Sequence, residues 1–144
     1  MKFSICLCYN LSMTLEELAK QNNIKYIVLF GSQAMGMQRE DSDFDIAIFR
    51  DEFKSLEEYT NVLFGLEEVL GFCSDKIDLT NLKYADPLLR YEITSKGKLL
   101  YGNELDYEEF CAFAFKDYVD SKPLFDLRFE LLKKRNKELQ KYVK

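Results

Sequence analysis

The chain has 144 residues, of which 47% are hydrophobic, so it can bury one apolar core and is expected to form a single domain. It contains no histidine, which excludes Ser-His-Asp and Cys-His catalysis, and its net charge of −5 argues against direct binding to nucleic acid. Its four cysteines include no Cys-x-x-Cys pair, so we expect no zinc site and reduced thiols in a cytoplasmic protein. No apolar stretch reaches the ~20 residues that span a bilayer, so we expect no membrane partner.

The first predicted elements are a helix, a buried strand and a second, short helix. The first helix covers residues 12–20 and begins at a capping box formed by Thr14 and Glu17. Residues 24–30, with the sequence IKYIVLF, are rich in β-branched and aromatic side chains, which predicts a buried strand. A short helix at 33–38 is expected to follow the turn after this strand.

The middle of the chain predicts a strand, a helix and another strand. The sequence FDIAIF at 44–49 is typical of a strand, and KIDLTNL at 76–82 alternates strictly between apolar and polar residues. Between them, residues 51–71 form an amphipathic pattern, and Ser55 with Glu58 offers a second capping box.

The last third predicts mainly helices. Helices are expected at 87–95, 106–120 and 123–143, and a short strand is expected at 99–101. Strands that alternate with helices predict an α/β (α+β) fold, in which helices pack on a small mixed sheet. We expect a core at 1–105 and a C-terminal helical extension at 106–144 that packs on the core, so that the whole chain is one domain.

Basic residues crowd the end of this extension: Lys133, Lys134, Arg135, Lys137, Lys141 and Lys144. One interpretation is the solvated face of a last helix. The other is a docking segment for an acidic surface of a partner.

Candidate chemistry begins with Gly31 and Ser32, which end the first predicted strand. A glycine lets the backbone approach a ligand closely, and a serine hydroxyl can bind phosphate. After ten intervening residues come Asp43 and Asp45, whose carboxylates are expected on the same face of a strand, roughly 6–7 Å apart along the backbone. Asp45 is flanked by apolar residues, where an unpaired carboxylate is costly, and a bound metal ion would compensate that cost.

Asp78 repeats this pattern, because it is a carboxylate between the apolar residues Ile77 and Leu79 in the predicted strand at 76–82. Three carboxylates on neighbouring strands can bind two Mg²⁺ ions, which prefer oxygen ligands. The weaker candidates for contact with a triphosphate are Gln33, Arg39, Arg90 and Lys96.

The motif Gly-Ser-x10-Asp-x-Asp, with the later aspartate, resembles the signature of the DNA polymerase β-like nucleotidyltransferases. The short chain is most similar to their minimal branch, the MNT antitoxins of type VII HEPN/MNT toxin–antitoxin systems, over about residues 24–103. This resemblance implies the polymerase β-like nucleotidyltransferase fold. It also implies that Gly31 and Ser32 bind the β- and γ-phosphates of ATP, while Asp43, Asp45 and Asp78 are the catalytic residues and bind the metal ions.

The function that the resemblance implies is Mg²⁺-dependent transfer of AMP from ATP to a tyrosine hydroxyl of a cognate HEPN ribonuclease toxin. The toxin would be neutralised, and the two proteins would form a hetero-oligomer. Two alternatives stay open: a non-catalytic antitoxin that only covers the toxin, and a nucleotidyltransferase that modifies a small molecule such as an antibiotic. A protein acceptor fits better, because the roughly 40 residues after the core are too few for a separate pocket domain.

Overall fold

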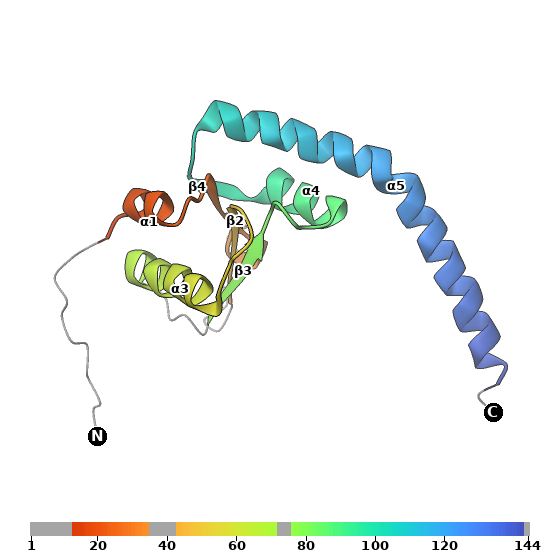
Figure 1. Cartoon of the computed structure of the whole chain (residues 1–144). Coiled ribbons are helices and arrows are strands. Elements are labelled where there is room, and N and C mark those ends of the chain that lie inside the picture. Colours follow the sequence, from red (N-terminus) through yellow and green to blue (C-terminus); the bar gives the residue numbers. More distant parts are fainter. Residues whose placement is uncertain (1–12, 35–42, 72–75, 143–144) are drawn as a thin grey trace, which may run out of the picture.

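Helices and strands alternate in the predicted order in this computed structural model, which describes residues 13–34, 43–71 and 76–142 (Figure 1). The elements are α1 (Leu15–Gln21), β1 (Tyr26–Phe30), α2 (Gly31–Ala34), β2 (Phe44–Phe49), α3 (Leu56–Leu70), β3 (Ile77–Asn81), α4 (Pro87–Lys96), β4 (Lys98–Tyr101) and α5 (Glu104–Gln140). The predicted α/β (α+β) class is confirmed. Of the short helix expected at 33–38, the structure describes only the first residues, since 35–42 lie outside the described ranges.

The four strands form one mixed sheet in the order β3-β2-β1-β4. Strand β1 pairs with β2 and β4 in antiparallel fashion, whereas β2 and β3 are parallel. The register places Phe30 opposite Asp45, and Asp45 opposite Asp78. The end of β1 and the starts of β2 and β3 therefore meet at one edge of the sheet.

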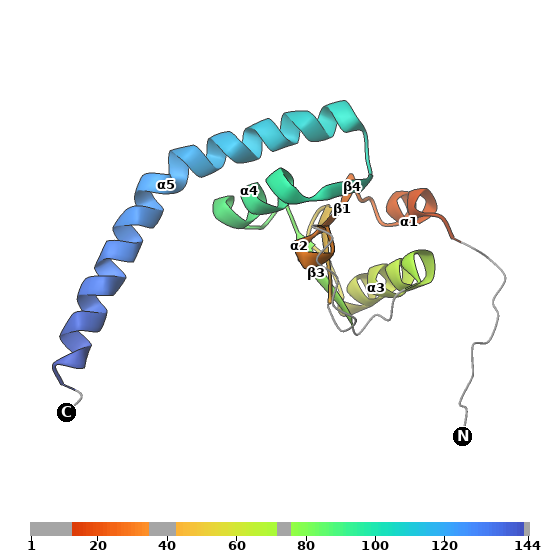
Figure 2. The same cartoon turned by 180° about the vertical axis from the view of Figure 1, so that it is seen from behind.

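The two faces of the sheet carry separate cores. On one face, Ile27, Ile46 and Ile48 pack against α1 and α3. On the other face, Tyr26, Val28, Ala47 and Phe49 pack against α4 and the first turns of α5. Figures 1 and 2 show α1 and α3 on one side of the sheet and α4 and α5 on the other. Successive side chains of a strand point to opposite faces, so Asp45, Asp78 and Thr80 share with Ala47 the face of α4 and α5.

The predicted capping box of α1 is confirmed, because the Thr14 N–H donates to Glu17 Oε2 (2.8 Å) and the Glu17 N–H donates to Thr14 Oγ1 (3.2 Å). Helix α1 ends at Gln21. Its side chains Leu18 and Ala19 are buried against the sheet.

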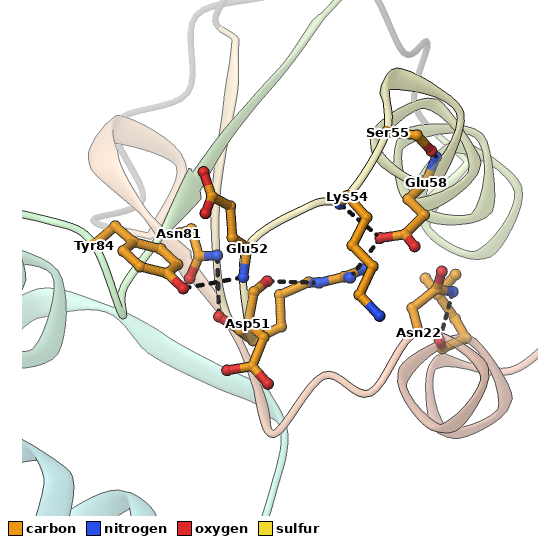
Figure 3. A network of polar contacts seen from close by, with 10 residues as sticks. Asn22, Asp51, Glu52, Lys54, Ser55, Glu58, Asn81 and Tyr84 are labelled. Carbon is orange, nitrogen blue, oxygen red and sulfur yellow. Dashed lines mark hydrogen bonds and ion pairs between the residues drawn. The ribbon is translucent and has the colours of Figure 1, made fainter.

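Helix α3 begins later than predicted, at Leu56. Ser55 caps it as expected by accepting the Glu58 N–H. The Glu58 carboxylate turns toward the preceding loop, where it accepts the Lys54 N–H (3.2 Å) and pairs with Arg50 (2.9 Å) (Figure 3). These contacts hold the loop after β2 in a non-helical conformation.

The prediction of two helices at 106–120 and 123–143 is wrong, because α5 is one helix of 37 residues that contains Pro123. Proline lacks an N–H and its ring crowds the preceding turn, which kinks a helix without necessarily ending it. Helix α5 bends midway (Figure 1). Its first half buries Tyr107 and Ala114, whereas its second half is exposed. The division into a core at 1–105 and an extension at 106–144 stays a prediction.

Within the described ranges, no helix combines the length and the apolar character required to cross a membrane.

Candidate active site

The turn after β1 brings the backbone of Gly31 against the side chain of Asp45. Gly31 has a φ of +73°, and a Cβ atom at this position would lie 1.9 Å from Asp45 Oδ2. A side chain at residue 31 would therefore be strained by the backbone conformation and would also collide with the carboxylate. Glycine is required here to make room for Asp45, which is a reason that the sequence alone did not reveal.

Asp45 and Asp78 are direct neighbours across the parallel strands β2 and β3. Adjacent strands lie about 4.8 Å apart, so the two side chains leave the same face of the sheet side by side. Asp45 is half-buried and Asp78 is exposed. The structure thus brings together two of the three predicted catalytic carboxylates.

Asp43 lies just before β2, two residues from Asp45, and is exposed. Burial raises the pKa of the Asp45 carboxyl, and the negative charges of Asp78 and Asp43 raise this pKa further. Asp45 therefore lies within the electrostatic reach of both other carboxylates. Their mutual repulsion is the kind of charge imbalance that a bound cation relieves.

The donor chemistry of this carboxylate group fits magnesium, because carboxylate oxygens are hard ligands that Mg²⁺ prefers. In the described part of the chain, however, no three acidic, histidine or cysteine side chains already converge as a metal site. Because like charges repel, these carboxylates are expected to stay apart without a cation and to move closer together when a cation is bound. Asp43, Asp45 and Asp78 are the residues that would hold the metal.

A cavity of about 350 Å³ opens beside the Gly-Ser turn, between α2 and α4. Its lining residues are Phe30, Gly31, Ser32, Leu89, Glu92, Ile93 and Lys96. The aromatic and aliphatic side chains form an apolar wall, while Ser32, Glu92 and Lys96 supply polar groups. Ligand pockets commonly have this composition, with a few polar groups on a mostly apolar lining.

Three of these residues, Leu89, Glu92 and Ile93, were not considered from the sequence. Helical spacing carried a signal: Leu89 and Ile93 are four residues apart, as are Glu92 and Lys96, so each pair lies on one side of α4. That side could be related to the Gly-Ser turn only once the packing of α4 was known. Lys96, a weaker sequence candidate, does line the cavity.

Arg90, another weaker candidate, has a structural role. Its guanidinium donates to the carbonyl oxygens of Leu82 (3.0 Å) and Ala85 (2.9 Å) and pairs with Asp117 (2.8 Å). These partners connect α4 to the loop after β3 and to α5. Arg39 lies outside the described residues, and the side chain of Gln33 is not described.

Comparison with known proteins identifies the family of this chain. The sequence model of the family described as "Polymerase beta, Nucleotidyltransferase" matches residues 13–106. A curated relative from Aphanizomenon flos-aquae, named protein adenylyltransferase MntA, is 36% identical over 104 residues, which are 65% of this chain and 69% of the relative.

Two solved structures share the fold. A crystal structure of a toxin–antitoxin with AMP-PNP is 25% identical, with a TM-score of 0.61 over 80% of this chain and 95% of that chain. An MNT antitoxin in complex with a tri-AMPylated HEPN toxin from Shewanella oneidensis is 22% identical, with a TM-score of 0.55 over 80% and 92% of the two chains. The family match covers more than half of the chain, and the resemblance inferred from the Gly-Ser-x10-Asp-x-Asp motif is confirmed: the chain belongs to the polymerase beta nucleotidyltransferase family.

Proposed function

We propose that this protein is an adenylyltransferase antitoxin, which transfers AMP from ATP to a tyrosine hydroxyl of a partner HEPN toxin and thereby neutralises it. The observation that carries the proposal is the placement of Asp45 and Asp78 opposite each other, with Asp43 nearby and Gly31 against the Asp45 carboxylate. A relative at 36% identity is named a protein adenylyltransferase, and a toxin–antitoxin structure with AMP-PNP shares the fold; both support the proposal.

In the proposed reaction the triphosphate lies along the Gly-Ser turn. The absence of a side chain at Gly31 allows the phosphates to approach the backbone, and the Ser32 hydroxyl donates a hydrogen bond to the β- or γ-phosphate. Asp43, Asp45 and Asp78 would hold the two Mg²⁺ ions. When bound, such ions supply Lewis-acid stabilisation of the charge on the reacting phosphoryl group and on the leaving pyrophosphate.

Asp78 is the residue that receives the proton of the attacking tyrosine hydroxyl. A bond forms between the tyrosine oxygen and the α-phosphorus, the bond from this phosphorus to the bridging oxygen of the β-phosphate breaks, and pyrophosphate leaves. The products are an AMP-modified tyrosine and pyrophosphate, so no further reactant is needed. Most of the rate enhancement comes from positioning and from charge neutralisation.

The cavity between α2 and α4 is the proposed site for the nucleoside end of ATP. It adjoins Ser32, its volume of about 350 Å³ suits a nucleoside, and Phe30, Leu89 and Ile93 offer an apolar wall for a base. Lys96 at the same cavity supplies a positive charge near the phosphates.

The test uses ATP labelled with ³²P at either the α- or the γ-phosphate, together with Mg²⁺ and a candidate HEPN acceptor, sought as the product of the adjacent gene. We expect label on the HEPN protein from the α-position only. It should be lost in Asp45→Asn and Asp78→Asn. It should be kept in Asp51→Asn, because the Asp51 carboxylate, on the loop after β2, is 84% exposed and pairs with Lys83 on the loop after β3.

Other outcomes would point to the alternatives. Transfer from the γ-position would contradict AMP transfer. Neutralisation that survives Asp45→Asn would indicate an antitoxin that acts by covering the toxin, and label that appears only on an added antibiotic would indicate a small-molecule enzyme.

A further inference from the structure

The second half of α5 is an exposed helix with an apolar surface. Here residues 119–140 are called the distal segment. Its exposed apolar side chains are Val119, Leu124, Leu127, Phe129, Leu131, Leu132 and Leu139, each with an exposed fraction between 46% and 69%. Figures 1 and 2 show from opposite sides that this part of α5 extends away from the sheet and its covering helices. Contiguous exposed apolar surface of this kind marks an interaction site.

The spacing of part of this surface is typical of helix pairing. Phe125, Phe129, Leu132, Asn136 and Leu139 follow one another at intervals of four, three, four and three residues, so they lie along one stripe of the helix. We call this stripe the α5 seam. An alternation of three and four defines the a and d positions of a coiled coil, and a single asparagine at an a position is a known device that fixes the register.

The flanks of the seam carry positive charge. Arg128 and Arg135 lie on one flank, and Lys133 lies on the other flank with Asp126; residues 128–142 hold six basic but only two acidic side chains. Such flanking positions select the partner of a paired helix through their charges. The charge pattern therefore complements a helix whose flanking residues are acidic.

A second copy of this chain is a poor partner for the same reason. In a parallel pair of two α5 seams, Arg128 of one copy would face Lys133 of the other. In an antiparallel pair, Arg128 would face Arg135 of the other copy. Both arrangements bring like charges together beside an apolar seam, where they destabilise the pair.

The seam also lies beyond the residues that the family model matches, because that match ends at residue 106. It is therefore not needed to build the sheet, the carboxylate group or the cavity. Residues of α5 that do contact the sheet face, Tyr107 and Phe110, are in its first half.

We propose that the α5 seam is the docking site for an acidic amphipathic helix of the acceptor protein, and that it holds the acceptor beside the Asp45–Asp78 pair. The identity of the partner as the acceptor rests on the proposed function; the chemistry of the docked helix rests on the seam alone. Docking through α5 would raise the local concentration of the acceptor hydroxyl without any contribution to the chemical step.

The first test measures binding of two fluorescent 28-residue peptides to the full chain by anisotropy. Both carry leucine at a and d positions; one has glutamate and the other lysine at the flanking positions. We expect binding of the glutamate peptide only. The Arg128→Glu/Arg135→Glu variant should bind it at least about tenfold more weakly and should gain binding of the lysine peptide.

The matched control is Lys134→Glu/Lys141→Glu, which changes the net charge equally on the side of α5 opposite the seam. It should alter glutamate-peptide affinity by less than about threefold, apart from long-range effects that added salt removes. Equal loss of binding in both variants would overturn docking through the seam. A stable dimer of the free chain that Phe129→Ser/Leu132→Ser abolishes would assign the seam to a second copy and overturn the proposal.

The second test separates this inference from the proposed function. With the HEPN protein as acceptor, the Arg128→Glu/Arg135→Glu variant should raise the KM for the acceptor at least about tenfold and leave kcat unchanged. An unchanged KM would overturn the assignment of the acceptor as the docked partner. Absence of AMP transfer by the unaltered chain, with selective binding of the glutamate peptide intact, would reject the proposed function and leave the acidic-helix site standing.

Discussion

The backbone of Gly31 and the carboxylate of Asp45 are in such close contact that a Cβ atom on residue 31 would lie 1.9 Å from Asp45 Oδ2. The turn that is proposed to bind phosphate thus contacts the strand that is proposed to bind metal, and the contact is made at Gly31. This contact fixes where the Asp45 side chain can lie relative to Ser32. Phosphate binding and metal binding are therefore expected to fail together if the contact is disturbed.

The first prediction concerns Gly31→Ala. Because the residue has a φ of +73° and the new methyl group would collide with Asp45, we expect a loss of unfolding free energy beyond the about 1–2 kcal/mol of left-handed backbone strain, together with loss of AMP transfer. Gly71→Ala is the matched control, since Gly71 has the same φ of +73° and no atom within 4 Å of the added Cβ. Chemical denaturation of both variants measures the difference. Equal destabilisation of the two variants would contradict the contact. In the Gly31→Ala background, Asp45→Ala should recover the part of the loss that the collision causes, and no recovery would also contradict the contact.

Asp45→Asn should separate stability from activity. The folded state raises the pKa of Asp45 through burial and through the charges of Asp78 and Asp43, so protonation of this group stabilises the fold. That contribution is present below its ordinary pKa and is lost as the pH rises through the raised folded-state pKa. At neutral pH the charged carboxylate is therefore unfavourable, and we expect Asp45→Asn to raise the Tm in metal-free buffer while it lowers AMP transfer more than about a hundredfold.

The next prediction compares the Tm of the unaltered chain and of Asp45→Asn with and without added Mg²⁺. Added Mg²⁺ should raise the Tm of the unaltered chain, because binding to the folded state alone is stabilising, and a chelator should reverse the rise and stop AMP transfer. The Asp45→Asn variant should show a much smaller rise. A variant that is less stable than the unaltered chain without metal, and equally stabilised by Mg²⁺, would contradict the electrostatic account of this site.

Arg90→Ala should destabilise the fold. The guanidinium, 13% exposed, satisfies the Leu82 and Ala85 carbonyl oxygens and the Asp117 carboxylate, and its removal leaves these acceptors without a partner. We expect a loss of about 2–4 kcal/mol in unfolding free energy, measured by urea denaturation. Lys116→Ala is the comparison, because its ion pair with Asp120 is exposed on both sides and should contribute less than about 1 kcal/mol. Similar small losses in both variants would show that Arg90 is not an anchor of α4.

Tyr26 and Tyr107 both lie in the core between the sheet and helices α4 and α5. We expect the substitution Tyr→Phe to have different effects at the two positions. Among the described residues, the buried Tyr107 hydroxyl has only the Cys111 thiol, a weak hydrogen-bonding group, as a hydrogen-bonding side-chain neighbour, whereas the Tyr26 hydroxyl donates to the Asp106 carbonyl (3.0 Å). Tyr107→Phe should therefore leave the unfolding free energy unchanged or raise it, and Tyr26→Phe should lower it by about 1 kcal/mol. Thermal and urea denaturation of the two variants would test this, and the reverse order of stabilities would contradict the described packing.

Much of the fold was predictable because local signals and tertiary packing agree. The alternation in FDIAIF and KIDLTNL predicted strands, and β2 and β3 lie within one residue of the expected ends. The capping box of Thr14 and Glu17 marked the start of α1. The site motif is local in the sequence, so Asp43 and Asp45 could be paired before any packing was known.

The parts that were missed depend on contacts between distant residues. Pro123 predicted a helix end, but the kinked helix continues, since a proline removes one hydrogen bond and need not remove those of the turns beyond it. The glutamate of the second predicted capping box, Glu58, pairs with Arg50, a partner that helical spacing does not indicate. The cavity formed by α4 and the Gly-Ser turn required the packing of helix on sheet, which no local pattern contains.

AMP transfer to a protein is tested first by the intact mass of the adjacent-gene product, as the candidate HEPN toxin, after incubation with this chain, Mg²⁺ and ATP. We expect the mass of this acceptor to rise by one or more AMP units, attached to a tyrosine, and to stay unchanged with the Asp43→Ala/Asp45→Ala variant. An unchanged mass in a complex that still forms and still neutralises the toxin would contradict catalysis by the Asp43, Asp45 and Asp78 group.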